Sequence, residues 1–186
     1  DLILINKKKM DLHNTLLNTR IKKMSKKANI KSLNSLIYEE IRGETKVFLE
    51  EFLRRIITVT QYYDKQTISV NHIYMAADSF LLIGKNKIPK CKELNNKMEI
   101  CLEFPKTSFK KLLKQIIDDE KYRKPTTLHT SKFSYENVII GDDASQLIQY
   151  YVEQYMLKIL SKARIVMLNA KRQTLYPKDI KTVLEN

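Results

Sequence analysis

The stretch LIYEEIRGETKVFLEEFLRRIITVTQYY, residues 36–63, decides the fold of this chain. It contains no proline and only one glycine, so it predicts a single helix of about 42 Å. Its apolar residues recur at helical spacing in two stripes: Ile37, Ile41, Phe48, Phe52, Ile56, Val59 and Tyr63 in one, and Tyr38, Leu49, Leu53 and Ile57 in the other. A helix with two apolar stripes must be covered on two sides. A compact 100-residue domain has a radius of gyration of only ~13 Å, so this helix would cross its whole domain.

A repeated decapeptide indicates where that cover comes from. DKQTISVNHI, residues 64–73, aligns without a gap with KRQTLYPKDI, residues 171–180. Each copy follows a long apolar stretch and precedes a short one. The second long stretch also carries two stripes: Ile148, Val152, Tyr155, Ile159, Ala163, Val166 and Ala170 in one, and Leu147, Tyr151, Met156, Leu160 and Met167 in the other. We therefore predict a duplicated helical unit.

Each unit is expected to have a short helix on either side of its long one. The short helices are predicted at 18–28, 69–79, 108–118 and 176–185, with Ser69 and Ser108 as N-caps and Pro177 in a first turn. One unit cannot cover both stripes of its own long helix, whereas two units clasped antiparallel can. The predicted fold is therefore all-α, with two short–long–short units paired within one chain.

The charge of the chain suggests a polyanionic partner. Lys and Arg number 34 against 21 Asp and Glu, which gives a formal charge of +13. Such an excess suits nucleic acid or an anionic membrane surface. No run approaches the ~18 apolar residues of a membrane span, and LILI at residues 2–5 is too short for a signal-peptide core. We expect a nucleic-acid partner and no membrane.

The same inventory gives no support to an enzyme. No two of the three glycines are close, which excludes a phosphate-binding glycine loop. Cys91 and Cys101 lack zinc-site spacing and a nearby histidine, so no metal or other cofactor is expected. The cysteines fit a reducing intracellular compartment, although they could also form one disulfide. The three histidines are scattered and match no catalytic pattern.

The two units resemble two different core histones. LIYEEIRGETKVFLEEFLRRI resembles the central helix of the histone conventionally numbered four, and AKRQTLYPKDI resembles the second loop and last helix of histone three. The fusion is similar to the histone doublets of large DNA viruses. The resemblance implies two histone folds joined in an intramolecular handshake. Its divisions would be a short N-terminal segment at 1–17, a histone four-like fold at 18–80, a connector at 81–103 and a histone three-like fold at 104–186.

The resemblance also implies a function, which is to package double-stranded DNA. This chain would wrap duplex DNA in a nucleosome-like particle, together with a second doublet that resembles histones two-B and two-A. Histone octamers wrap ~146 bp of DNA without base-specific contacts. That length is known for histone octamers and is not predicted for this chain. The alternative is a histone-fold interaction subunit of a transcription or chromatin assembly that does not wrap DNA. The implied location is intracellular and chromatin-like, in a virion, a viral factory or a host nucleus.

The expected DNA contacts follow from the clasp and from the resemblance. Clasping would bring the first loop of each unit beside the second loop of the other, gathering amides, hydroxyls and cations that bind phosphates. Carried over by position, the contacts are Lys22, Lys23, Lys26, Lys27, Lys31, Lys65, Thr67, Lys111, Lys114, Lys171, Arg172 and Thr174. Ser32 and Ile139 stand where histones place minor-groove arginines. Arg123, Lys124 or Lys132 could substitute for the second of these.

Three further groups of residues are expected to have structural roles. Arg172 and Asp179 match an arginine–aspartate pair that ties the second loop to the last helix. Self-association through the histone three-like half is expected at Val166, Leu168, Asn169, Ile180 and Leu184, with Asn169 in place of a family histidine. The partner doublet is expected to contact Tyr62, Tyr63, His72 and Tyr74. In the connector, the alternating MEICLEF predicts a short extended segment packed on the helices.

Overall fold

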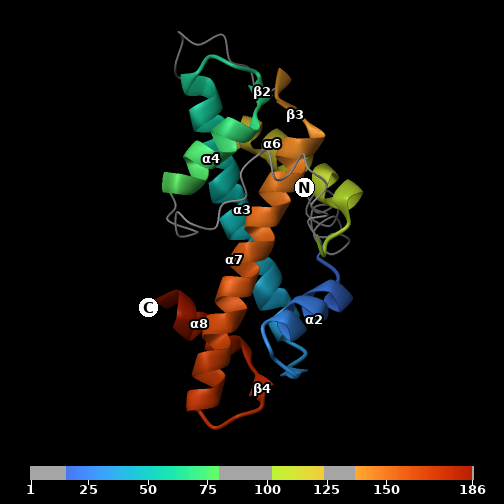
Figure 1. The fold of residues 1–186 in the computed structure, drawn as a ribbon, viewed down its shortest axis with the longest axis vertical. Coiled ribbons are helices and arrows are strands. Elements are labelled where there is room, and N and C mark those ends of the chain that lie inside the picture. The colour runs from blue at the N-terminus through green and yellow to red at the C-terminus, as the bar shows by residue number, and fades with distance from the viewer. Residues whose placement is uncertain (1–15, 80–101, 124–136, 186) are drawn as a thin grey trace.

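The computed structural model describes residues 16–79, 102–123 and 137–185 (Figure 1). The helices within these ranges are α2 (Asn18–Lys27), α3 (Ile37–Tyr62), α4 (Val70–Ser79), α6 (Lys106–Arg123), α7 (Asp142–Asn169) and α8 (Pro177–Glu185). The strands are β1 (Ser32–Leu33), β2 (Thr67–Ile68), β3 (Ile139–Ile140) and β4 (Thr174–Leu175). The all-α fold with two short–long–short units is confirmed.

The two long helices cross at the centre of the molecule, as predicted from their double stripes (Figure 1). The helices α2 and α6 lie on one side of this crossing, and α4 and α8 lie on the other (Figure 1). At the crossing, the Phe48 ring stacks on Tyr155 with centroids 3.8 Å apart, and Phe52 meets Tyr151 edge to face at 5.5 Å. Both long helices carry two acidic residues in the first turn, which suit the positive end of a helix dipole.

Each hydrophobic core contains residues from both units. One cluster joins the second half of α3 and α4 to α6 and the first half of α7. The other joins α2 and the first half of α3 to the second half of α7 and α8. Phe52, Leu53 and Leu160, which belong to the predicted stripes, are fully buried in these clusters. Neither unit therefore has a core that the other does not help to build.

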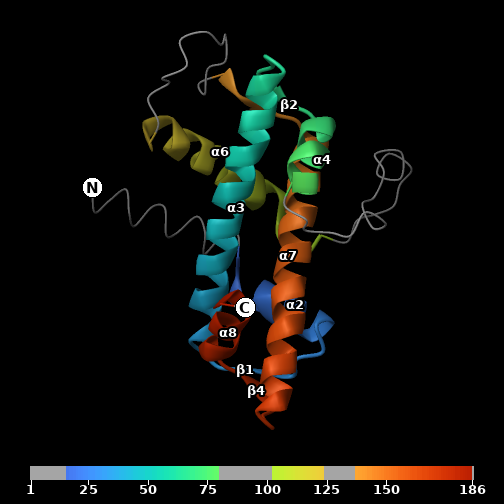
Figure 2. The same ribbon diagram turned by 90° about the vertical axis from the view of Figure 1, so that its left-hand side faces the viewer.

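Two short parallel strand pairs join the loops of the two units. Ser32 lies opposite Thr174 in the β1–β4 pair, and Thr67 lies opposite Ile139 in the β2–β3 pair. The first loop of each unit thus lies beside the second loop of the other. The pairs lie at opposite ends of the crossed helices (Figures 1 and 2).

The decapeptide repeat begins with the same helix end in both units. Asp64 and Lys171 have φ values of 50° and 53°, in the left-handed region. The Asp64 and Lys171 amides donate to the carbonyl oxygens of Gln61 and Leu168, respectively. The amides of the following residues, Lys65 and Arg172, donate to the carbonyl oxygens of Thr60 and Met167. These are the two hydrogen bonds of a Schellman motif, which is most often built on glycine. An aspartate and a lysine occupy that position here.

The N-terminal ends of α4 and α8 agree with the prediction, and that of α6 does not. Ser69 caps α4, and Pro177 opens α8, as expected. Ser108 is not a cap, because α6 begins at Lys106 directly after Pro105 and continues to Arg123. Of the connector, only its end, Leu102 and Glu103, is described, and it forms no strand. None of the described helices has the length and apolar character needed to cross a membrane.

Residues 18–80 expressed alone should be unfolded or aggregated. The separated unit would expose the face of α3 that α7 covers, including Phe52 and Leu53. Each exposed side chain of this size costs ~1.5–3 kcal/mol. Circular dichroism, thermal unfolding and sedimentation of the peptide test this expectation. A cooperative transition of a monomer would contradict it.

Candidate nucleic-acid interface

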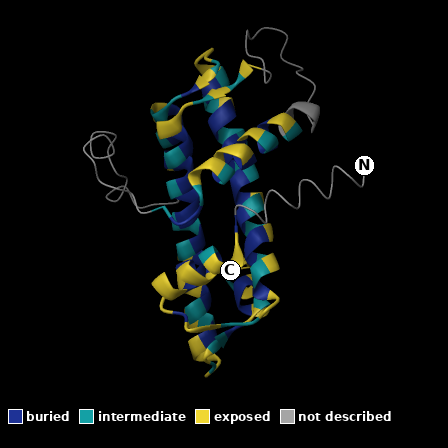
Figure 3. Ribbon diagram, turned by 90° about the vertical axis from the view of Figure 1, so that its right-hand side faces the viewer, coloured by how far each residue is buried: buried dark blue, intermediate teal, exposed yellow. Residues whose placement is uncertain are grey.

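The lysines predicted to contact DNA lie on one side of the molecule. The side with α2 and α6 also holds both strand pairs, and exposed residues follow both helices (Figure 3). The exposed lysines of these two helices are Lys22, Lys23, Lys26, Lys27, Lys106, Lys110, Lys111 and Lys114. Those of α6 line a groove of about 630 Å³ whose other wall includes Val138, Ile139 and Ile140.

The two loop pairs present hydroxyls and cations, as the clasp predicts. At the β1–β4 end, Thr174 Oγ1 donates to Ser32 Oγ at 3.2 Å, with Lys31 and Lys171 exposed nearby in the chain. At the β2–β3 end, Lys65 and Thr67 are exposed. All of these side chains are accessible to a phosphate backbone.

The strand register is the same at Ser32 and Ile139, the two residues expected at the positions of minor-groove arginines. Ile139 holds the position opposite Thr67 that Ser32 holds opposite Thr174. A long loop precedes Ile139, and the equal register supports its alignment with a minor-groove arginine. Ile139 is 59% exposed, so an uncharged side chain faces solvent there. Lys124, Lys132 and the side chain of Arg123 lie outside the described part of the chain.

The distribution of charge is uneven between the two sides. Helix α2 carries Arg20 and four lysines and no acidic residue. On the opposite side, α4 carries no cation and one acidic residue, Asp78. A field of this shape attracts a polyanion to the α2–α6 side.

The ion pair expected between Arg172 and Asp179 is present. The guanidinium binds the carboxylate with both terminal nitrogens, at 2.5 and 3.0 Å, and lies over the Tyr176 ring. Asp179 is 1% exposed and also accepts the amide hydrogen of Tyr176 at 2.9 Å. Burial alone would raise the pKa of Asp179, but Arg172 and this amide hold it below its usual range. The pair therefore fastens the second loop to the first turn of α8.

Replacing Asp179 by Ala should lower the free energy of unfolding by about 3 kcal/mol. This is the lower end of the range for breaking a buried pair, since Arg172 remains partly exposed. Because the carboxyl pKa is depressed by folding, its contribution is present above pH ~3.9 and is lost as the pH falls further. Denaturant unfolding at pH 7 measures the change, with exposed Glu185→Ala as the control. An unmoved midpoint for Asp179→Ala would contradict this role.

His72 takes the place of Asp179 in the first unit, and it is buried. Its amide donates to Ser69 Oγ at 3.4 Å, and its Nδ1 accepts the Ser69 amide hydrogen at 3.3 Å. The ring stacks on Tyr63 and has Thr60 Oγ1 at 3.2 Å from Nδ1. The expectation that His72 contacts a partner doublet is therefore wrong, because the side chain is 8% exposed and caps α4. Burial, and then the charge of Lys65, lowers its pKa.

The native chain should lose more stability than a His72→Gln variant as the pH decreases from 7 to 5. Because the folded state lowers the pKa of His72, the neutral form stabilises the fold above pH ~6.5, and that contribution is lost on acidification. His72→Gln keeps an acceptor at the third residue of α4, where it completes a Ser-x-x-Gln capping box with Ser69. The glutamine side chain cannot titrate. Melting temperatures across this pH range should therefore fall less for His72→Gln than for the native chain. Equal slopes would show that His72 does not carry the effect.

The predicted self-association surface needs one correction. Ile180 is 0% exposed and packs in the core that contains Met156 and Leu160, because α8 folds back over α3 and α7. It cannot form an interface. Leu168 and Leu184 are exposed, as is Asn169, and Val166 is half-buried. Exposed Ile165 and Tyr176, which were not predicted, extend the apolar surface of this end.

The corresponding end of the first unit is also exposed. Tyr62 is 84% exposed, Tyr63 is exposed and Tyr74 is half-buried. Tyr62 and Tyr63 meet edge to face at 5.3 Å. Three of the four residues expected at this surface therefore remain accessible.

Two of the predicted DNA contacts have a partner that the sequence did not reveal. Lys23 and Lys27 form ion pairs with Glu103, at 2.8 and 2.5 Å. Glu103 belongs to the connector and is remote in sequence from α2. No spacing pattern could have shown this contact.

Comparisons with known proteins agree with this architecture. The family model for the core histone domain, which covers histones two-A, two-B, three and four, matches residues 85–185, more than half of the chain. The crystal structure of the histone from Methanopyrus kandleri superimposes with a TM-score of 0.63, covering 90% of this chain and 92% of that chain. The two sequences are 14% identical, so this second likeness concerns the fold.

Proposed function

This chain belongs to the core histone family, and on that basis we propose that it packages double-stranded DNA by wrapping it. The observation that carries the proposal is the placement of both loop pairs and the lysines of α2 and α6 on one side (Figure 3). The loop pairs lie at the ends of helices about 40 Å long, slightly more than one 34–36 Å turn of DNA. Both can therefore face the same side of one duplex.

We further propose that the chain is a histone doublet. Residues 18–80 would be the histone four-like fold, 81–103 the connector and 104–186 the histone three-like fold. The two units have matching helix ends and strand pairs but different residues at the second loop, which supports two related but distinct halves. The resemblance of these halves supports an origin in a large DNA virus and a place in a virion, a viral factory or a host nucleus.

Binding should depend on phosphate contacts rather than on base sequence. The loops offer amides, hydroxyls and lysines, which are phosphate ligands. Uncharged Ser32 and Ile139 occupy the positions of the family's minor-groove arginines. Affinity without those arginines should be strongly salt-dependent, since each neutralised phosphate releases counterions.

Nuclease digestion of DNA reconstituted with this chain should leave protected fragments of uniform length. Wrapping shields a fixed length of duplex, and the length should not depend on base sequence. The digestion is done on two unrelated sequences, with and without a doublet resembling histones two-B and two-A. The absence of Arg at positions 32 and 139 favours the second candidate function, an interaction subunit that does not wrap DNA. A continuous smear under all four conditions would favour that candidate.

Two molecules should associate through the second unit. The exposed Leu168 and Leu184, with Ile165, lie at the end that resembles the pairing surface of histone three. A symmetric dimer is the commonest closed assembly. Asn169 can donate and accept hydrogen bonds but cannot become a cation, so the pairing should be weaker without DNA than with it.

Sedimentation at moderate salt, with and without DNA, tests this association. The native chain should pair on DNA, and Leu168→Glu should not, because it places a charge in an apolar interface. Val47→Glu is the control, since Val47 is exposed on α3. Equal pairing by native and Leu168→Glu chains would exclude this surface. The opposite end, with Tyr62, Tyr63 and Tyr74, is proposed to bind the second doublet.

A further inference from the structure

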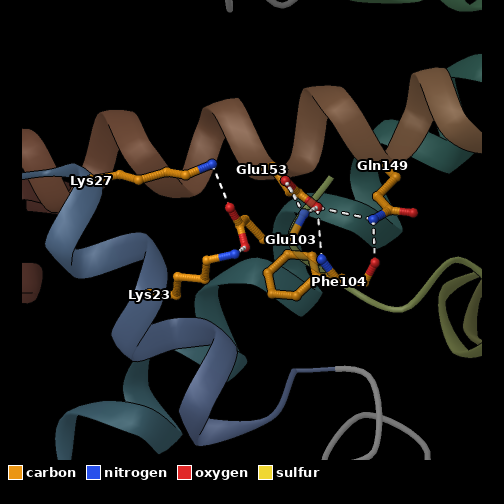
Figure 4. A network of polar contacts seen from close by, with 6 residues as sticks. All are labelled: Lys23, Lys27, Glu103, Phe104, Gln149 and Glu153. Carbon is orange, nitrogen blue, oxygen red and sulfur yellow. Dashed lines mark hydrogen bonds and ion pairs between the residues drawn. The ribbon is translucent and has the colours of Figure 1, made fainter. Parts of the chain in front are cut away.

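The end of the connector is fastened between the two units. The amides of Glu103 and Phe104 donate to the Glu153 carboxylate of α7, at 2.9 and 3.0 Å (Figure 4). Gln149 Nε2 donates to the Phe104 carbonyl and to Glu153, both at 2.9 Å. The Phe104 ring is buried in the core that includes α2. Backbone and side chain thus hold this segment in one position.

This fastening directs the Glu103 side chain at two lysines of α2. Its carboxylate meets Lys23 Nζ at 2.8 Å and Lys27 Nζ at 2.5 Å (Figure 4). The Glu103 side chain is 4% exposed, whereas those of Lys23 and Lys27 are 59% and 42% exposed. Burial alone would raise the pKa of Glu103, but the two ammonium groups hold it below its usual value. A buried carboxylate therefore receives its compensating charge from two surface lysines.

The remaining lysines of α2 are arranged differently. Lys22 and Lys26 are also separated by one helical turn, on an adjoining face. Within the described residues they have no ion-pair partner, and both are exposed. One helix thus carries two equally spaced lysine pairs, and in the described part of the chain one of these pairs binds a carboxylate.

We propose that Glu103 occupies Lys23 and Lys27 in the way a DNA phosphate would, so that only Lys22 and Lys26 of α2's four lysines bind DNA. The inference rests on the proposed function and names the residue that limits DNA affinity along α2. The balance of charges decides which partner the lysines keep. If they turned to DNA, a buried carboxylate would lose both of its cations, which is strongly unfavourable. A phosphate on the duplex is solvated and screened by salt, so its attraction is weaker.

Salt dependence of binding to a mixed-sequence duplex counts the lysines that contact phosphate. Each contact weakens Kd about 3.5-fold between 50 and 200 mM salt, so two contacts account for about 12-fold. The quantity compared is the Kd at 200 mM salt divided by the Kd at 50 mM salt. In Lys22→Ala/Lys26→Ala, this ratio should therefore fall by about 12-fold. In Lys23→Ala/Lys27→Ala, a matched pair on the same helix, the ratio should stay within about twofold of the native value.

Glu103→Gln tests the same inference from the other partner. Neutralising the carboxylate while keeping an acceptor oxygen should release both lysines to DNA and raise the ratio by up to about 12-fold. Adding Lys23→Ala and Lys27→Ala to Glu103→Gln should return the ratio to the native value without leaving a buried charge. Circular dichroism melts confirm that each variant is folded.

Three results would overturn the inference. The first is a Kd ratio in Glu103→Gln that equals the native ratio. The second is an equal fall of the Kd ratio in Lys22→Ala/Lys26→Ala and in Lys23→Ala/Lys27→Ala. The third is no binding by the native chain at 50 mM salt, which would also remove the proposed function. The first two leave the proposed function intact, so the two failures are distinguishable.

Discussion

The structure depends on one constraint, which is that α3 and α7 each carry two apolar stripes, and the short helices of one unit cannot cover both stripes without the other unit. Both cores contain residues of both long helices, and the Phe48–Tyr155 stack lies where they cross. Crossing antiparallel brings each first loop to the other unit's second loop, which creates the two strand pairs. It also leaves α2 and α6 on a single side. The single lysine-rich side is thus a consequence of how the hydrophobic stripes are buried.

The two ends of the molecule share a backbone but differ in chemistry. At one end, Arg172 and Asp179 hold the second loop to α8 with an ion pair that is stable at neutral pH. At the other, His72 caps α4 through a neutral ring nitrogen. Lowering the pH from 7 is therefore expected to weaken the His72 cap before the Arg172–Asp179 pair. The same Schellman motif at Asp64 and Lys171 shows that the difference lies in side chains and not in backbone geometry.

Local sequence patterns predicted most of the fold. The stripes predicted the extent of α3 and the position of α7, although α7 begins at Asp142, before its first stripe residue, Leu147. The repeat placed α4 and α8. The repeat could also have identified Ile180 as core, since it aligns with Ile73 and both are 0% exposed. The likeness to a dimer surface predicts an exposed Ile180 instead, and that prediction is wrong. The N-terminus of α6 was missed because Ser108 is a good cap, whereas Pro105 gives a less familiar start.

The contacts that could not be predicted join segments remote in sequence. Glu103 reaches Lys23 and Lys27 only because Glu153 fixes the connector's backbone beneath α2. No periodicity in the chain encodes this meeting. The sequence therefore predicts that every lysine of α2 contacts DNA. The tertiary structure divides these lysines into one pair that binds Glu103 and one pair that does not. Position in a helix shows which residues are exposed, but not what they bind.

The melting temperature as a function of protein concentration tests most directly whether the clasp forms within one chain. It is measured without DNA on the Leu168→Glu chain, so that association through the second unit does not contribute. An intramolecular clasp predicts the same melting temperature over a hundredfold range of concentration, with the mass of a monomer in sedimentation. A melting temperature that rises with concentration would show that α3 of one chain is covered by α7 of another, since only association couples stability to concentration.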